Sequence, residues 1–248
     1  MRKVLLLLVF ALVSGSALLA ADPQEVMYKS GAEQVKAVSY MPTGEGPFPA
    51  LIVIHEWYGL NDWVKQQASD LADQGYVTLA IDLYRGKLAT SSDEAHELMR
   101  GLPEDRAARD LRAAFEYLEA QKSVNPKRIG SIGWCMGGGY SLETALVQPR
   151  LAATVINYGR LVTDPASLKK ITAPVLGIFG GKDRGIPVES VKAFESELKK
   201  LGKKVEIHIY PDAGHAFQNE HNKAGYRPED AKDSRAKTLA FLQSTLKK

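Results

Sequence analysis

The sequence predicts an α/β fold in which a mostly parallel sheet is covered by helices on both of its faces. Short apolar segments alternate with longer segments whose apolar residues recur at helical spacing. Strands that alternate with helices form parallel sheets, because each connecting helix packs on a face of the sheet. Such sheets carry their functional sites at the carboxyl ends of the strands. The residues that follow each predicted strand are therefore the first candidates for a site.

The predicted strands are short segments rich in aliphatic side chains. The first is at 35–41, and the second, at 49–55, is almost entirely apolar. Short continuous apolar runs are consistent with strands that are buried on both faces. The strands that follow have the same apolar character, and they lie at 76–81, 128–133, 151–158, 173–179 and 204–210.

The predicted helices lie between these strands. The segment 62–74 places Val64, Ala68 and Leu71 on one helical face. The segment 103–121 begins with Pro-Glu-Asp, which is a favourable first turn for a helix. The remaining long helices are predicted at 138–147, 188–201 and 228–246.

The N-terminus has the layout of a secretory signal peptide. Two basic residues precede an apolar run at 4–13, and a stretch of small residues follows at 14–21. We expect cleavage near Ala20 or Ala21 and an exported protein, either periplasmic or secreted. The alternative is an uncleaved N-terminal anchor, although the run is shorter than the roughly 20 apolar residues that span a bilayer. The prediction is therefore a signal peptide at 1–21 and a single domain at 22–248, a length typical of one α/β domain.

The composition is that of an ordinary globular protein. The formal net charge is +3, and Arg2 and Lys3 in the predicted leader account for two of these charges. No basic block suggests a nucleic-acid partner. We expect a small-molecule substrate, no nucleic acid, and no membrane association of the mature chain unless the leader is retained as an anchor.

Cys135 is the single cysteine of the sequence, so the chain cannot form an internal disulfide. A lone cysteine is often a small buried apolar residue, but its surroundings here indicate a nucleophile. The segment Gly133-Trp134-Cys135-Met136-Gly137 follows a predicted strand and has the spacing of a nucleophile elbow, with cysteine in place of serine. Such a turn is sharp, so the residues two before and two after the nucleophile must be small. It also places the thiol at a helix N-terminus, whose dipole favours a thiolate.

A base and an orienting acid follow later in the chain, in the order that this kind of site requires. Asp183 comes just after the strand at 173–179, and His215 lies in the loop after the last strand. The histidine would accept the thiol proton, and the carboxylate would orient the imidazole. Asp212 is a rival acid, and His55, which also ends a strand, is a rival base.

With these residues in view, the sequence resembles the dienelactone hydrolase family over essentially the whole chain after the leader. The resemblance rests on the elbow and on four further motifs in the same order, at 55–61, 75–84, 181–183 and 214–217. It implies an α/β-hydrolase fold and a catalytic triad of Cys135, Asp183 and His215. It also implies an enzyme that cleaves small carboxylic esters or lactones through an acyl-enzyme, with no metal or organic cofactor.

The resemblance implies further roles for residues near the nucleophile. Glu56 matches the family's strand-end glutamate, toward which the resting thiol points until substrate displaces it toward the histidine. Such a switch would protect an exported thiol from oxidation. The oxyanion would be held by two backbone N–H groups, those of Trp57 and Met136.

Two departures from the family pattern bear on the substrate. The family holds a substrate carboxylate with two arginines, but the first region reads Ala-Thr-Ser-Ser-Asp at 89–93, and the second position is Asn219. Bidentate binding of a carboxylate needs the guanidinium fork. We therefore expect an uncharged ester or lactone. The residues expected to line the pocket, with Trp57, are Tyr58, Tyr84, Arg85, Arg160 and Phe217.

Two other functions remain open at this point. The same triad would also serve acyl transfer or peptide-bond cleavage. A protein of a different class, a non-catalytic sensor or binding protein that uses its thiol, would have no need of Asp183 and His215 at matched strand ends.

Overall fold

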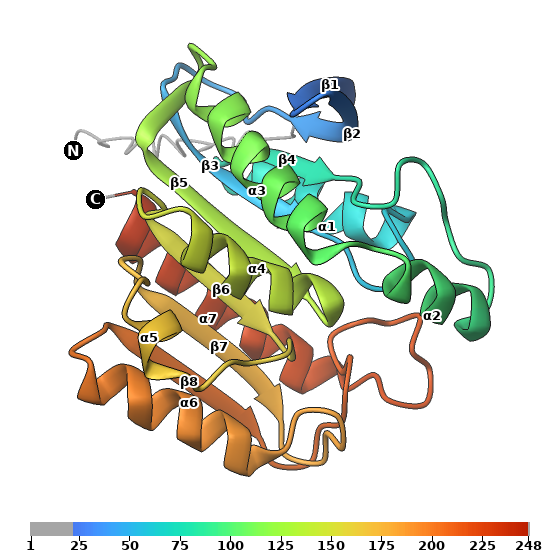
Figure 1. Ribbon diagram of the computed structural model, residues 1–248, viewed down its shortest axis with the longest axis vertical. Coiled ribbons are helices and arrows are strands. Elements are labelled where there is room, and N and C mark those ends of the chain that lie inside the picture. Colours follow the sequence, from blue (N-terminus) through green and yellow to red (C-terminus); the bar gives the residue numbers. More distant parts are fainter. Residues whose placement is uncertain (1–21, 248) are drawn as a thin grey trace, which may run out of the picture.

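An eight-stranded sheet forms the centre of the computed structural model, which describes residues 22–247. The strands lie in the order β1-β2-β4-β3-β5-β6-β7-β8 (Figure 1). All neighbours from β4 to β8 are parallel, whereas β1 and β2 run antiparallel at one edge. The strands are β1 (Gln24–Ser30), β2 (Glu33–Tyr40), β3 (Phe48–Ile54), β4 (Val77–Ile81), β5 (Val124–Trp134), β6 (Ala153–Asn157), β7 (Val175–Gly180) and β8 (Val205–Tyr210). The predicted mostly parallel sheet is thus confirmed, and the predicted signal peptide lies outside the described residues.

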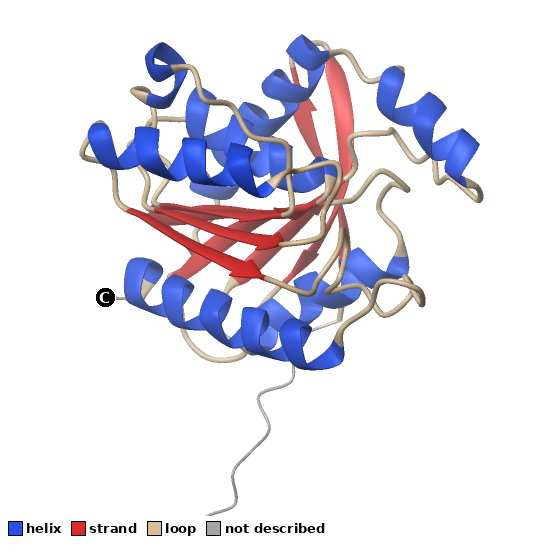
Figure 2. Ribbon diagram, turned by 90° about the horizontal axis from the view of Figure 1, so that it is seen from below, coloured by secondary structure: helices blue, strands red, loops and turns tan. Residues whose placement is uncertain are grey.

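Helices cover both faces of the sheet, as Figure 2 shows. One face packs against α3, α4, α5 and α6, and the other packs against α1 and α7. Within residues 22–247, no helix has the length and apolar character needed to span a bilayer. The helices are α1 (Asp62–Asp73), α2 (Ser92–Arg100), α3 (Glu104–Glu119), α4 (Met136–Val147), α5 (Pro165–Leu168), α6 (Val188–Lys200) and α7 (Pro228–Leu246).

The central strands are buried on both faces. Every residue of β4, β6 and β7 is buried, and so is every residue of β3 after the first. Burial on both faces explains why these strands read as continuous apolar runs in the sequence. Their carboxyl ends meet at one edge of the sheet, where α2 and the loop between β8 and α7 also lie (Figure 1).

Some elements were not among the predicted ones. The edge strand β1 was missed because its exposed side chains alternate with few buried ones, and Met27 is 56% exposed. The short helix α5 was also absent from the predicted set. In addition, α4 begins at Met136, two residues before the predicted start, because the helix continues directly from the nucleophile turn.

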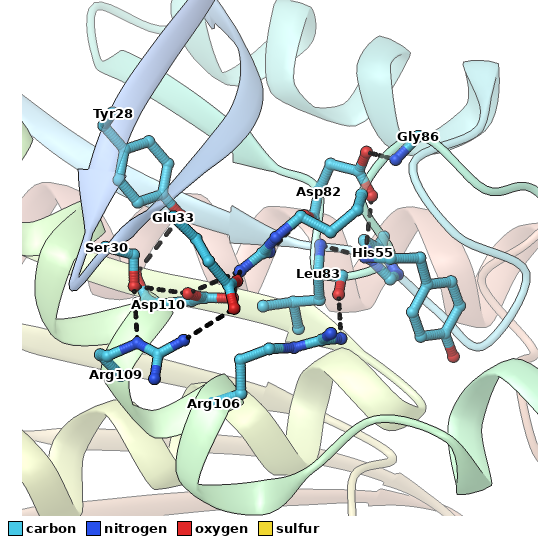
Figure 3. A network of polar contacts seen from close by, with 12 residues as sticks. Tyr28, Ser30, Glu33, His55, Asp82, Leu83, Gly86, Arg106, Arg109 and Asp110 are labelled. Carbon is cyan, nitrogen blue, oxygen red and sulfur yellow. Dashed lines mark hydrogen bonds and ion pairs between the residues drawn. The ribbon is translucent and has the colours of Figure 1, made fainter.

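A buried acid, Asp110 of α3, joins the β1–β2 hairpin to the rest of the molecule (Figure 3). It accepts a hydrogen bond from Ser30 Oγ at 2.5 Å and forms an ion pair with Arg85 at 2.8 Å. Arg85 also pairs with Glu33 at 2.8 Å. The prediction that Arg85 lines the substrate pocket is therefore wrong, because its guanidinium is held between the hairpin and α3.

We expect Arg85→Met to lower the free energy of unfolding by about 3 kcal/mol, because it leaves the buried carboxylate of Asp110 without its ion-pair partner. Urea denaturation measures the change. Arg100→Met is the matched control, because Arg100 pairs with Glu97 on the surface, and it should cost less than about 0.5 kcal/mol. Adding Asp110→Asn to Arg85→Met should recover part of the loss. Equal, small effects of the two arginine substitutions would show that the buried pair does not anchor the hairpin.

Candidate active site

The turn between β5 and α4 holds Cys135 in an unusual backbone conformation. Its φ is +54° and its ψ is −118°, and it forms the N-cap of α4. An L residue with positive φ is strained by on the order of 1–3 kcal/mol and persists only when its surroundings enforce it. A Cβ at Gly133 would overlap the backbone of Gly137, and one at Gly137 would overlap the carbonyl of Ile54. The two glycines are therefore required by close backbone contact, as the sequence pattern predicts.

The acid and the base lie in loops that follow β7 and β8. His215 Nδ1 donates to Asp183 Oδ2 at 2.7 Å. The second carboxylate oxygen of Asp183 accepts from the backbone N–H groups of Gly185 at 2.8 Å and Ile186 at 3.1 Å. Burial opposes ionisation of Asp183, but these hydrogen bonds outweigh it, so its pKa is lowered. The rival acid Asp212 instead forms an exposed ion pair with Lys182.

His215, the predicted base, lies between this acid and Cys135, the predicted nucleophile. Burial disfavours its imidazolium form, but hydrogen bonds with Asp183 and Cys135 and the charges of both raise its pKa to about 10. With Nδ1 committed to Asp183, Nε2 is the nitrogen that is available to Cys135. The structure therefore brings together the three side chains predicted as a triad, although they come from three separate strand ends.

Glu56 lies next to this triad and is almost completely buried. Its Oε2 accepts a hydrogen bond from Asn219 Nδ2 at 2.7 Å, and its Oε1 has no hydrogen-bond partner. Burial raises the pKa of Glu56 to about 7, while the Asn219 bond and the charge of His215 act in the opposite direction. A half-partnered buried carboxyl is easily protonated, because only one of its oxygens is compensated for the loss of water.

The two backbone N–H groups predicted for the oxyanion hole flank the site. Met136 is the first residue of α4, and Trp57 follows Glu56 in the turn after β3. Among residues 22–247, the backbone hydrogen bonds of loops, turns and caps include none donated by either group. The indole of Trp57 packs edge-on against His96 of α2, with ring centroids 4.8 Å apart. The helix α2 thus lies over this side of the site.

The residues predicted to line the pocket differ in their burial and their contacts. Tyr58 is half-buried, and its hydroxyl lies 3.2 Å from Ser92 Oγ of α2. Tyr84 donates to the sulfur of Met136 at 3.1 Å, and burial raises its pKa. Arg160 is exposed at the end of β6. Phe217 is fully buried, so its assignment to the pocket wall is wrong.

Phe217 lies in the core beneath His215. Its ring packs against Tyr158 at 5.7 Å and Tyr210 at 5.0 Å between centroids. The sequence could not separate a wall residue from a core residue here, because both are apolar and adjoin the catalytic loop.

His55, the rival base, is a structural residue. Its side chain is completely buried, and burial lowers its pKa. Its Nδ1 lies 2.6 Å from the carbonyl oxygen of Glu56, and its Nε2 accepts from the backbone N–H of Leu83 at 3.2 Å. This arrangement fits a neutral ring that joins the ends of β3 and β4 and has no nitrogen free for proton transfer.

Three residues around the triad were not predicted as part of the site. Tyr158 packs edge-on against His215 at 5.3 Å, and its buried hydroxyl has no hydrogen-bond partner. Asn157 and Gln218 form hydrogen bonds beneath the nucleophile turn. Strand-end position was the only available signal for Tyr158 and Asn157, and Gln218 carried none. No cluster of three or more His, Cys, Asp or Glu residues in the described part of the chain is arranged to hold a metal ion.

Comparison with known proteins places this geometry in a family. The model of the dienelactone hydrolase family matches residues 35–246. A Methylorubrum extorquens protein assigned as a carboxymethylenebutenolidase is 33% identical over 213 residues, which cover 80% of this chain and 73% of the relative. A Bradyrhizobium protein assigned as a 2-oxo-3-(5-oxofuran-2-ylidene)propanoate lactonase is 33% identical and covers 82% and 86%. The crystal structure of a Klebsiella pneumoniae protein assigned as a dienelactone hydrolase superposes with a TM-score of 0.82 at 29% identity, covering 92% of this chain and 99% of that one.

The shifted pKa of Glu56 has a consequence for stability. A carboxyl whose pKa rises from 4.5 to about 7 on folding binds more protons in the folded state, so stability is lost as the pH rises through this range. The loss is on the order of 3 kcal/mol, at about 1.4 kcal/mol for each pKa unit. We expect Glu56→Gln to remove this part of the pH dependence, because its amide does not ionise. Thermal unfolding of both proteins between pH 4.5 and pH 8.5 provides the measurement, and parallel curves would contradict the raised pKa.

Proposed function

The protein belongs to the dienelactone hydrolase family, and we propose that it hydrolyses uncharged carboxylic esters or lactones through a Cys135–His215–Asp183 triad. Family membership makes it an ester or lactone hydrolase. The identity of the triad, the acyl-enzyme and the uncharged substrate form the proposal. Its strongest support is that His215 bonds the buried carboxylate of Asp183 at 2.7 Å and that its pKa is raised by Cys135, the residue at the strained turn.

Acylation would begin with transfer of the thiol proton to His215. The Cys135 thiolate then attacks the carbonyl carbon, and the electron pair of the C=O bond moves to oxygen. The N–H groups of Trp57 and Met136 would stabilise this oxyanion, and removal of one such donor typically costs about 100-fold or more in rate. Collapse of the intermediate breaks the C–O bond, and the leaving alkoxide takes the proton from the imidazolium. With a lactone, the alcohol stays attached to the acyl group.

Deacylation would use His215 again, now as the base that accepts a proton from water. His215 removes a proton from water as the water oxygen attacks the thioester carbonyl. The tetrahedral intermediate then expels the Cys135 thiolate, and the carboxylic acid is released. The imidazolium then returns its proton to the thiolate, which restores the thiol for the next cycle. The bond from Asp183 keeps the imidazole in one orientation through both steps.

Glu56 fits a role in holding the resting thiol. Its Oε1 is buried without a partner, so it is the carboxylate oxygen that can accept a hydrogen bond from the thiol. A thiol position beside His215, whose pKa Cys135 raises, would correspond to the second position of the same switch. Rotation between the two acceptors would lower the fraction of reactive thiolate when no substrate is bound.

The charges around the site favour an uncharged substrate. Asn219, at the position where the family pattern has an arginine, uses its side chain to bond Glu56 and His221 N–H. The guanidinium of Arg85 already forms ion pairs with Glu33 and Asp110. Asn219 carries no guanidinium group and that of Arg85 is already paired, so neither residue offers a guanidinium fork to a substrate carboxylate.

We expect Cys135→Ala to reduce hydrolysis of a short-chain aryl ester by at least about 1000-fold, because the covalent path is lost. Mass spectrometry of acid-quenched wild-type enzyme should show a peptide containing Cys135 heavier by one acyl group. Asp183→Asn should retain some activity but lose on the order of 100-fold or more in kcat, because the imidazole loses its orienting acceptor. Equal hydrolysis by wild type and Cys135→Ala would refute the proposed nucleophile.

A matched pair of lactones tests the substrate. We expect kcat/KM for a neutral butenolide to exceed that for the same ring carrying a carboxylate by about tenfold or more, because an unpaired anion would be desolvated in the site. Steady-state hydrolysis of both compounds by wild-type enzyme measures the ratio, with Arg160→Gln as the control for the exposed cation. A preference for the carboxylate form that disappears in Arg160→Gln would show that Arg160 binds an acidic substrate.

A further inference from the structure

The last residue of β6, Asn157, contacts the nucleophile turn on both sides of Trp134. Its side-chain Nδ2 donates to the carbonyl oxygen of Gly133 at 3.0 Å. Its backbone carbonyl oxygen accepts the N–H of Cys135, also at 3.0 Å. Asn157 is 1% exposed, so water does not compete for these bonds. One residue of the neighbouring strand therefore holds the backbone immediately before and at the strained nucleophile.

Gln218 connects this residue to the loop that carries the base. Its Nε2 donates to Asn157 Oδ1 at 3.1 Å and to Ser234 Oγ of α7 at 3.0 Å. Its Oε1 accepts the indole N–H of Trp134 at 2.7 Å. Gln218 thus bonds to the side chain of the residue before the nucleophile and to the residue that holds the turn. Its side-chain amide has partners for both of its donors and for its oxygen.

Gln218 lies only three residues after His215, and the intervening backbone is constrained. Ala216 has a φ of +54°. Asn222 Nδ2 donates to the carbonyl oxygen of His215 at 3.1 Å. A displacement of Gln218 would therefore be transmitted to the imidazole rather than absorbed by a flexible segment.

From these contacts we propose that Asn157 and Gln218 are positioning residues that fix the distance and orientation between the Cys135 thiol and the His215 imidazole. The proposal rests on Cys135 and His215 acting as the nucleophile and base proposed above. The two groups come from strand ends on opposite sides of β6, and a misplacement of about 1 Å between reacting groups can cost on the order of 100-fold in rate. The Asn157–Gln218 hydrogen bond links the loop of His215 to the residue that holds the nucleophile turn, alongside the bond between Gln218 and Trp134.

A neighbouring contact shows why this link differs from simple loop anchoring. Glu220, in the same loop, accepts the indole N–H of Trp63 at 2.8 Å. That bond ties the loop to α1, which carries none of the triad. By contrast, the Gln218 bond ends on the residue that holds Cys135 N–H, so its loss changes the relation between base and nucleophile.

Two substitutions interrupt the series of hydrogen bonds from Gln218 through Asn157 to Gly133, each at a different bond. Gln218→Glu keeps a side-chain acceptor for the Trp134 indole but loses the donor to Asn157. Asn157→Asp keeps the acceptor for Gln218 but loses the donor to Gly133. We expect each to lower kcat for a short-chain aryl ester by about tenfold to 100-fold, with KM changed by less than about threefold.

Alkylation of Cys135 with the neutral reagent iodoacetamide gives a readout that does not depend on ester hydrolysis. A free thiol has a pKa of about 8.5, so at pH 6 it reacts slowly unless a base holds it as thiolate. We expect both variants to react at pH 6 about tenfold more slowly than wild type, and at pH 10 within about twofold of it. A slower reaction at pH 6 alone indicates that the thiol and the imidazole are misplaced, whereas a slower reaction at both pH values indicates that the reagent reaches the thiol less easily.

Ser131→Ala is the control for general destabilisation. Ser131 is buried in the same strand as the turn and bonds Ser141 and Thr154 rather than any triad residue. It should lower the midpoint of thermal unfolding while leaving kcat and the alkylation profile unchanged. If the Gln218 and Asn157 variants behave like Ser131→Ala, the positioning role is overturned. If wild type hydrolyses no ester but the alkylation ratio still falls in the variants, the proposed function fails and the positioning role stands.

Discussion

The backbone of Cys135 is the constraint on which the rest of the site depends. Its positive φ lifts the thiol out of the strand direction at the point where β5 passes into α4. No side chain larger than hydrogen fits at Gly133 or Gly137 because the turn brings strand and helix backbones into contact. The strain is sustained because the sheet is rigid on both sides of the turn, with β3 and β6 as neighbours of β5. A less buried sheet would allow this turn to relax.

Two buried carboxyl groups of the site, those of Asp183 and Glu56, have pKa values shifted in opposite directions. The difference follows from how many of their oxygens have hydrogen-bond partners. Asp183 has hydrogen bonds to both oxygens, and its pKa is lowered despite burial. Glu56 has one partnered oxygen and one without a partner, and its pKa is raised. Pairs of titratable groups whose pKa values are moved apart by their surroundings are typical of acid–base assignments in enzymes. Asp183 is thereby suited to support a cation, and Glu56 to exchange a proton or a hydrogen bond.

Several features could be predicted because they follow from local chemistry. The buried parallel strands are visible as apolar runs, and the nucleophile turn is visible as glycines at fixed distances from Cys135. Asp183 and His215 could be named because residues at the carboxyl ends of parallel strands converge on one edge. The edge strand β1 could not be found in the same way, because a strand with one neighbour and mostly exposed side chains has no apolar run. The predicted export of the chain rests on residues 1–21 alone.

By itself, then, the sequence determined the fold class and the places of Cys135, Asp183 and His215 at three strand ends, because sheet topology converts position along the chain into position in space. Only the tertiary structure decided which neighbouring groups are free to act. His55 and Arg85 both follow strand ends, as the site residues do, but their polar atoms are consumed by Leu83 and by Asp110 and Glu33. Hydrogen-bond partners come from distant segments, and burial sets the cost of leaving a group without one. Neither quantity can be read from the spacing of residues along the chain.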